Sequence, residues 1–208
     1  MTKQEARDLV YAGLKKSLKD PDFRLNQKEG AFARRIPIGF QKVYVPFYDY
    51  KPMFVFSLTV GIRLDAVEDI FNRFSGANSA GQKLTLTTIT RLSHFTGHLE
   101  EYKVSAPAEI ATALTDLGTV IQAKIMPFLA NYQDVRSLDT AMNTNKVPGF
   151  DSSNLLMHAM HSVILARLNG SSLYRRLVDE YEKSLRNYVA AEKERFNQLV
   201  RSLDEMSV

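Results

Sequence analysis

Every second residue is apolar between Phe54 and Leu64, and this alternation constrains the fold more than any other feature of the chain. Successive side chains of an extended strand point to opposite faces, so the pattern predicts one long strand with one buried face. That face would consist of Phe54, Phe56, Leu58, Val60, Ile62 and Leu64. The chain must therefore contain a sheet with one covered side.

Shorter strands are expected around this long strand. They span residues 23–28, 31–36, 39–50, 82–92 and 99–104. The turn Asp49-Tyr50-Lys51-Pro52 would join the long strand to the one before it as a hairpin, and Glu29-Gly30 would join the first two strands. Pro46 cannot donate a hydrogen bond to a ladder, so its strand is expected at an edge or a bulge.

Helical periodicity dominates the remainder of the chain. Thr2 and Glu5 match a capping box at the start of the first helix, and Asp65 with Glu68 is interpreted as the cap of a short second helix. A long amphipathic helix begins near Pro107. Pro127 must kink or divide that helix, because it lacks the amide that would bond to the preceding turn.

The region after residue 142 is expected to be a polar linker, residues 143–153, followed by two helices. Ser153 would cap the first of them, and the longest helix of the chain would follow over residues 171–205. We therefore predict an α+β fold, with an antiparallel sheet of about five strands flanked by helices in residues 1–142. A C-terminal helical hairpin, residues 154–208, would pack back on this part, either as an appendage or within one single domain.

The composition excludes several classes of protein. Hydrophobic residues make up 45% and charged residues 24% of the 208 residues, as is typical of globular proteins. The most apolar run, MFVFSLTVGI, is too short to cross a bilayer, and the N-terminus has no signal-peptide core. Cysteine is absent, which excludes disulfides, thiol nucleophiles and cysteine-ligated metals. We expect a cytoplasmic protein that does not enter a membrane.

The net charge of +4 raises the question of nucleic-acid binding. The excess lies in the first 60 residues, which hold 11 Lys and Arg against 6 Asp and Glu. These cations alternate with acidic residues and form no continuous run, so we interpret them as a solvated face. A nucleic-acid-binding protein is kept as the second alternative function.

The four histidines fall in two pairs, His94 with His98 and His158 with His161. Zinc lies about 2.1 Å from each ligand nitrogen, so its ligands must approach one another closely. His158 and His161 would meet this condition on a helix. His94 and His98 would lie about 13 Å apart in an extended strand, unless a turn at Thr96-Gly97 brings them together. The pairs are metal-ligand candidates, but we interpret them as ordinary histidines and expect no cofactor.

No established catalytic motif is present. The segment Gly76–Lys83 is close to a phosphate-binding loop, but Gln82 occupies the position of the essential lysine. A phosphate-binding loop also leads from a strand into a helix, whereas this segment is expected to lead from a helix into a strand. We therefore interpret it as a connection and expect no enzyme.

An aromatic cluster precedes the long strand and offers a contact surface for another protein. Tyrosines combine a large apolar ring with a polar tip, a combination that is common at protein interfaces. The candidate partner-binding residues are Tyr44, Phe47, Tyr48 and Tyr50. Ordinary strand packing is the alternative interpretation of the same residues.

Four segments in residues 1–142 resemble small bacterial domains of unknown function that are regarded as immunity-like binding proteins. They are PDFRLNQKEGAFARRI, IGFQKVY, FVFSLTVGIRL and AEIATALTDLGTVIQAKIMPFLANYQDVRSL. The resemblance implies a bacterial protein that neutralises a toxin by binding it. It carries no catalytic residues.

We therefore expect a non-enzymatic protein-binding domain, with bacterial toxin neutralisation as its concrete form. The first alternative is a metal-dependent enzyme that uses the histidines. The C-terminal helices could pack on their own chain or against a second copy, so a homodimer is left open.

Overall fold

The computed structural model describes residues 1–147, 150 and 154–206. The chain forms two compact units, each built from two separate stretches. Unit 1 comprises Met1–Ile62 and Thr90–Asn131, and unit 2 comprises Arg63–Ile89 and Tyr132–Val208. The predicted division at a linker, residues 143–153, stays a prediction, because residues 148–149 and 151–153 lie outside the described part of the chain. The same holds for the predicted cap at Ser153.

The larger sheet has five strands in the order β1-β2-β3-β6-β7. Its strands are β1 (Arg24–Asn26), β2 (Ala31–Ile36), β3 (Gly39–Tyr44), β6 (Thr59–Leu64) and β7 (Thr88–Arg91). The predicted hairpin of the first two strands is confirmed: β1 pairs antiparallel with β2, and Gly30 in their turn has a φ of +64°, which favours glycine. The antiparallel sheet and the α+β class are confirmed.

A second sheet has three strands in the order β4-β5-β8. They are β4 (Phe47–Tyr50), β5 (Met53–Phe56) and β8 (Tyr102–Val104), and β4 forms the expected hairpin with β5. The prediction of one long strand over residues 54–64 is wrong. Its first part, β5, belongs to the small sheet, and its second part, β6, belongs to the large one.

Both strands of the predicted long hairpin are divided between the two sheets: β3 and β6 belong to the large sheet, and β4 and β5 belong to the small one. Pro46 separates β3 from β4, and Ser57 with Leu58 separates β5 from β6. The amide of Ser57 donates to the Pro46 carbonyl over 3.2 Å, but Pro46 has no amide to return a bond. The hydrogen-bond ladder is therefore interrupted beside Pro46, which lies between β3 and β4 and belongs to neither strand.

The expectation of an exposed second face also fails for β6, whose residues Val60 to Leu64 are all buried.

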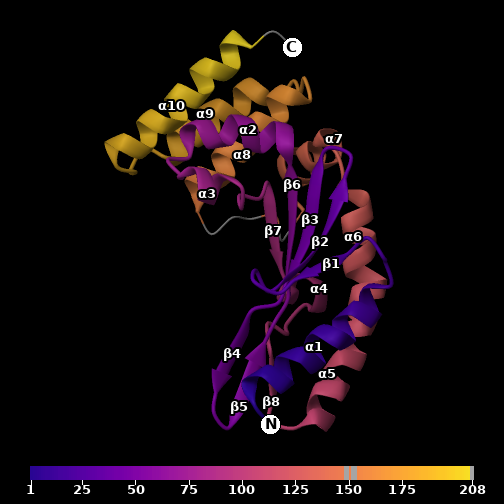
Figure 1. Ribbon diagram of the computed structural model, residues 1–208. Coiled ribbons are helices and arrows are strands. Elements are labelled where there is room, and N and C mark those ends of the chain that lie inside the picture. Colours follow the sequence, from indigo (N-terminus) through magenta and orange to yellow (C-terminus); the bar gives the residue numbers. More distant parts are fainter. Residues whose placement is uncertain (148–149, 151–153, 207–208) are drawn as a thin grey trace. The chain divides into compact units, whose positions relative to one another are not determined.

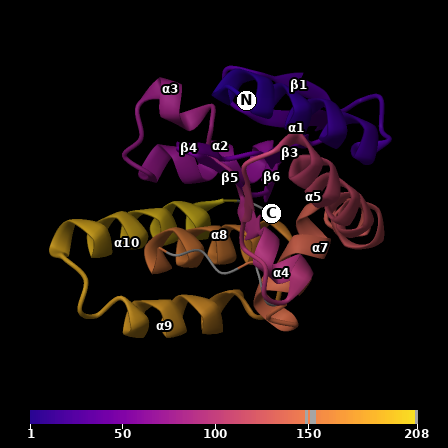
Figure 2. The same cartoon turned by 90° about the horizontal axis from the view of Figure 1, so that it is seen from below.

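The strands of unit 1 are accompanied by helices. These helices are α1 (Lys3–Leu18), α4 (Leu92–Thr96), α5 (Pro107–Val120), a π-helical turn η1 (Ile121–Ile125) and α6 (Met126–Asn131). Helix α1 begins with the predicted capping box and runs beside α5 (Figures 1 and 2). Tyr11 of α1 packs edge-on against Phe32 of β2, and the buried Gln41 of β3 donates to the Leu129 carbonyl of α6.

The long helix is divided before Pro127, as expected. The π-helical turn η1 lies directly ahead of Pro127, and Met126 donates to the Ile121 carbonyl, five residues back. Widening the helix in this way accommodates a residue that has no amide.

Unit 2 is mainly helical. It contains α2 (Asp65–Phe74), α3 (Ser79–Gln82), α7 (Val135–Asp139), a π-helical turn η2 (Thr140–Thr144), α8 (Leu155–Leu168), α9 (Tyr174–Ser184) and α10 (Ala190–Glu205). Helix α8 contacts α2, α7, α9 and α10, and each residue from Ala159 to Ala166 is buried (Figure 2). An apolar helix of this kind belongs in the centre of its unit.

The predicted C-terminal hairpin of two helices is in fact a group of three. The expected helix over residues 171–205 is interrupted between Ser184 and Ala190, and both of its parts contact α8. A continuous helix of that length would extend about 50 Å, much farther than α8 reaches. The interruption therefore allows Leu177 of α9 and Leu199 of α10 to be buried within the same unit.

No helix in the described part of the chain has the length and apolar character that a membrane crossing requires.

Candidate functional site

The small sheet of unit 1 exposes two tyrosines side by side. Tyr48 and Tyr50 alternate with Phe47 and Asp49 along β4, so both tyrosines point to the same face of the sheet. Their rings are stacked with centroids 6.1 Å apart, and the residues are 53% and 60% exposed. Large rings that remain this accessible contribute little to the core of the unit and are available to a partner.

The other two aromatic residues of the predicted cluster have different roles. Phe47 points to the opposite face of β4, where its ring lies 5.9 Å from that of Phe54 and 6.3 Å from that of Phe56. Tyr44 belongs to β3 in the large sheet, where its ring lies 5.5 Å from the Lys42 ammonium. The structure thus brings together Tyr48 and Tyr50 of the predicted residues, and it assigns Phe47 to packing.

Strand register defines the surface around the two tyrosines. Tyr48 pairs with Val55, Val55 pairs with Lys103, and Tyr50 pairs with Met53. Directly paired residues share a face of the sheet; Tyr48, Tyr50 and Lys103 are exposed on this face, whereas Val55 is buried. We call this surface the tyrosine face, and it consists of Tyr48, Tyr50, Met53, Val55 and Lys103. Lys51, in the turn after Tyr50, is also exposed.

The tyrosine face lies at the edge of the small sheet, because β4 is a terminal strand. Pro46 precedes this four-residue strand and Pro52 follows it. A short edge bounded by prolines is a poor template for adding another strand. A partner would therefore be recognised through side chains rather than through backbone pairing.

The histidine pairs do not form a metal site in the described residues. His94 lies in α4, which ends at Gly97, and His98 follows as an exposed residue. The segment is therefore helical up to Thr96 and not an extended strand. His94 packs against Phe95 and Phe128, and burial together with the charge of Lys124 lowers the pKa of His94.

The second pair, on α8, is divided between two neighbouring helices. His158 packs edge-on against Tyr181 of α9, whereas His161 stacks on Phe71 of α2 with ring centroids 4.2 Å apart. Within residues 1–147, 150 and 154–206, no group of three or more metal-ligating side chains could hold an ion.

A buried polar contact connects His161 to Glu68. The His161 Nε2 atom lies 3.0 Å from Glu68 Oε1, and the Thr87 hydroxyl donates to the same oxygen over 2.9 Å. Burial raises the pKa of Glu68. The interaction with His161 and the hydroxyls of Thr85 and Thr87 lower this pKa by a larger amount, so the net shift is downward. These contacts join the two stretches of chain that form unit 2.

The sequence pattern does not predict this pair. It predicts that Asp65 and Glu68 cap α2, which is wrong: Leu64 precedes α2 without a side-chain cap, and Asp65 pairs with Arg63 over 2.8 Å. A usable signal was present, because Glu68 lies one turn before Phe71 on the apolar side of α2. The pair is sealed from solvent, so we assign it a structural role.

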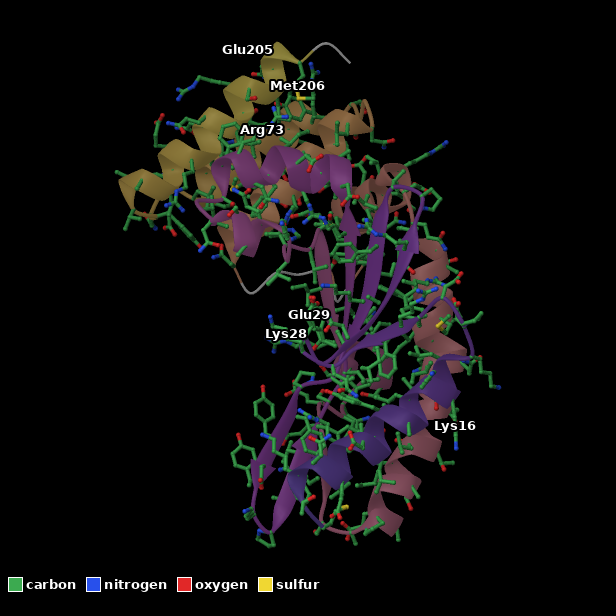
Figure 3. The ribbon with its side chains drawn as sticks, viewed as in Figure 1. Lys16, Lys28, Glu29, Arg73, Glu205 and Met206 are labelled. Carbon is green, nitrogen blue, oxygen red and sulfur yellow. The ribbon has the colours of Figure 1, made fainter. Side chains whose placement is uncertain are left out.

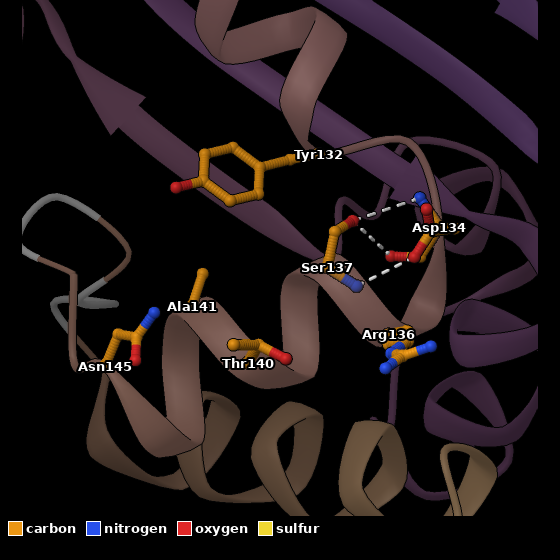
Figure 4. A pocket seen from close by; sticks show the side chains of 7 residues that line it. All are labelled: Tyr132, Asp134, Arg136, Ser137, Thr140, Ala141 and Asn145. Atoms are coloured by element: carbon orange, nitrogen blue, oxygen red, sulfur yellow. Dashed lines mark hydrogen bonds between the residues drawn. The ribbon is translucent and has the colours of Figure 1, made fainter.

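A surface cavity of about 360 Å³ lies beside α7 in unit 2 (Figure 4). It contains Asp134 and Ser137, which could suggest hydrolytic chemistry. Their bonds form a helix cap instead: the Ser137 amide donates to the Asp134 carboxylate over 2.7 Å, and the Ser137 hydroxyl donates to the Asp134 carbonyl over 3.0 Å. The hydroxyl has no base to activate it among these contacts, so we assign no catalysis here.

The loop that resembles a phosphate-binding motif is a connection, as expected. It contains the four-residue helix α3, and Arg63 holds it by donating to the carbonyls of Gln82 and Thr85. The strand predicted to start at Gln82 begins only at Thr88.

Comparisons with protein-family models, with curated protein sequences and with solved structures gave no match for this chain.

Proposed function

We propose that the protein is a non-enzymatic binding domain that holds another protein through the tyrosine face. The observation that carries the proposal is the stacked pair of Tyr48 and Tyr50, each more than half exposed on a rigid strand. Tyrosine supplies a large contact area with little loss of conformational entropy and can form a hydrogen bond through its hydroxyl. Such residues are enriched among those that dominate binding energy.

The partner is a different protein with an acidic surface. Lys103 lies on the tyrosine face and Lys51 lies beside it, while Glu101 pairs with Lys103 over 3.4 Å. Two copies joined through this face would bring lysines of one copy towards lysines of the other. An acidic partner would instead gain complementary charge at the rim of the contact.

A homodimer through the C-terminal helices is not part of this proposal. The apolar residues Phe196, Leu199 and Leu203 of α10 are buried within the chain itself. They already contribute to unit 2, so they would not provide the centre of a dimer contact.

The resemblance of residues 1–142 to immunity-like domains supports a concrete form of the proposal. In this form the partner is a bacterial toxin, and binding in the cytoplasm neutralises it. Rigid aromatic contacts with a charged rim suit the tight, specific binding that neutralisation requires.

The test identifies the partner through the tyrosine face and then measures the affinity. A photo-crosslinking amino acid at position 50 would capture the partner in cells. The captured protein would then be produced separately and titrated against the wild type, Tyr48→Ala/Tyr50→Ala and the control Ile38→Ala. Ile38 is an exposed apolar residue of unit 1 outside the tyrosine face.

We expect the double tyrosine variant to weaken binding by about a hundredfold, which corresponds to about 2.7 kcal/mol, while the control binds normally. Circular dichroism should show that all three proteins remain folded. Equal affinities for the wild type and the tyrosine variant would refute the assignment of this face. For the toxin form, co-expression with the captured protein should restore growth with the wild type and fail with the double variant.

A further inference from the structure

A second surface of unit 1 has the composition of an anion-binding site. A cavity of about 500 Å³ lies at β1, β2 and β3, and it is lined by Asp22, Arg24, Ala33, Arg34, Arg35, Phe40 and Lys42. Cavities of this size accept small organic ligands. The sequence suggested that these cations were scattered over a solvated surface, but the sheet gathers four of them at one place.

Strand register explains why three of the cations share a face. Arg24 pairs with Ala33, and Ala33 pairs with Lys42, so these residues form one row across the three strands. Arg35 pairs with Phe40 in the adjacent row and points to the same face, because it lies two residues after Ala33. Arg34, the fourth cation of the lining, alternates with Ala33 and Arg35 along β2, and its guanidinium is bonded to Asp20 and Gln41.

The cations surround an aromatic floor. The Lys42 ammonium lies 4.8 Å from the centroid of Phe40, and the Arg35 guanidinium lies 5.9 Å from the same ring. The Lys42 side chain is only 8% exposed, and its ammonium donates to Glu29 over 2.6 Å. Arg24 and Arg35 are exposed around this buried charge.

Cations outnumber acids among the described residues that line the cavity. The lining contains Arg24, Arg34, Arg35 and Lys42 but one acid, Asp22, and Glu29 lies beside it, paired with Lys42. Figure 3 labels Glu29 beside Lys28 in the turn after β1. These acids would repel the continuous phosphate backbone of a nucleic acid, which would pass over them. A compact ligand can contact the cations without approaching the acids. Guanidinium groups bind phosphate and carboxylate through two parallel hydrogen bonds.

We propose that this cavity binds a small, multiply charged oxyanion of the phosphate or polycarboxylate type. Arg24 and Arg35 bind its charged groups, and the buried Lys42, paired with Glu29, lines the cavity beside them. The site shares no residue with the tyrosine face, so its test is independent of the proposed function.

The experiment is calorimetric titration of the full-length protein with inorganic pyrophosphate and, separately, with citrate, in about 0.15 M salt. The site variant is Arg24→Gln/Arg35→Gln. The matched control is Arg176→Gln/Arg186→Gln, which makes the same change in net charge at two exposed residues of unit 2. All four positions are exposed, and circular dichroism verifies the fold of each variant.

We expect one or both anions to bind the wild type and the control alike, and the site variant to bind at least about tenfold more weakly. Tighter binding of pyrophosphate would identify the natural ligand class as phosphates, and tighter binding of citrate would identify it as polycarboxylates. Absence of binding of both anions up to about 10 mM would overturn the proposal. It would also be overturned by equal losses in the two variants, or by a duplex RNA that binds through Arg24 and Arg35 when neither small anion does.

Discussion

The buried Glu68–His161 pair should contribute strongly to the stability of unit 2, and replacing one partner should show it. The Glu68 and His161 side chains are 0% and 4% exposed, so a Glu68 carboxylate left without its partner could not be hydrated. Leaving a buried charge without its partner costs about 3–5 kcal/mol. We therefore expect His161→Leu to lower the free energy of unfolding by about that amount. Glu68→Gln removes the carboxylate but leaves buried polar groups with poorer partners, so we expect it to cost about 1–3 kcal/mol.

Replacing both partners should cost much less than the sum of the single changes. Glu68→Met/His161→Leu removes the buried carboxylate together with its imidazole partner and fills nearly the same volume, a change that is often close to neutral. Thr87 would lose the acceptor of its hydroxyl proton, but its oxygen still accepts from the Leu64 amide over 3.0 Å. That loss should cost about 1 kcal/mol.

The assay is urea unfolding followed by far-ultraviolet circular dichroism, with hydrogen exchange to localise the effect. Amides of α2 and α8 should lose protection in the single variants, because these helices carry the pair. The control is Glu180→Gln, which breaks the Arg176–Glu180 pair, with side chains 62% and 51% exposed, and should leave stability unchanged within error. Single-variant losses below about 1 kcal/mol, or a double variant that costs the full sum, would refute the reasoning.

Three further predictions concern pH and the glycines. The pKa of Glu68 is lowered in the folded protein, so its carboxylate stabilises the fold at any pH above its ordinary pKa of 4.5, and this stabilisation should be lost as the pH falls below that value. Acid titration should therefore destabilise the wild type more than Glu68→Met/His161→Leu. Parallel curves of unfolding free energy against pH would contradict this. Gly97 ends α4 with a φ of +87° and has open space around it, so Gly97→Ala should cost about 1–2 kcal/mol through backbone strain alone, and Gly97→Asn clearly less, as measured by urea unfolding. A Cβ at Gly13 would lie 2.4 Å from the Leu114 side chain, so Gly13→Leu should cost at least about 2 kcal/mol, and adding Leu114→Ala should recover part of the loss; no recovery would argue against a steric cause.

Local features of the fold were accessible from the sequence. The capping box at Thr2 and Glu5, the hairpin around Gly30 and the division of a helix before Pro127 each depend on residues within one or two turns of the chain. Short-range backbone geometry and capping hydrogen bonds determine these features, so local patterns predict them.

Other features could not be read from local patterns. The alternating pattern of residues 54–64 predicts buried side chains, but it does not specify that β5 and β6 belong to different sheets. The continuous helical period of residues 171–205 does not reveal the interruption before Ala190. In both cases, burial against distant elements outweighed the local preference for a longer strand or helix.

The sequence by itself determined the α+β class and local features such as the capping box and the first hairpin, because hydrophobic period and turn chemistry act over a few residues. Only the tertiary structure decided that Tyr48 and Tyr50 are exposed while Phe47 is packed. It also decided that Glu68 meets His161 and that Arg24, Arg35 and Lys42 surround one cavity. These outcomes depend on strand register and helix packing between distant parts of the chain, and such contacts are selected by the burial of the whole unit.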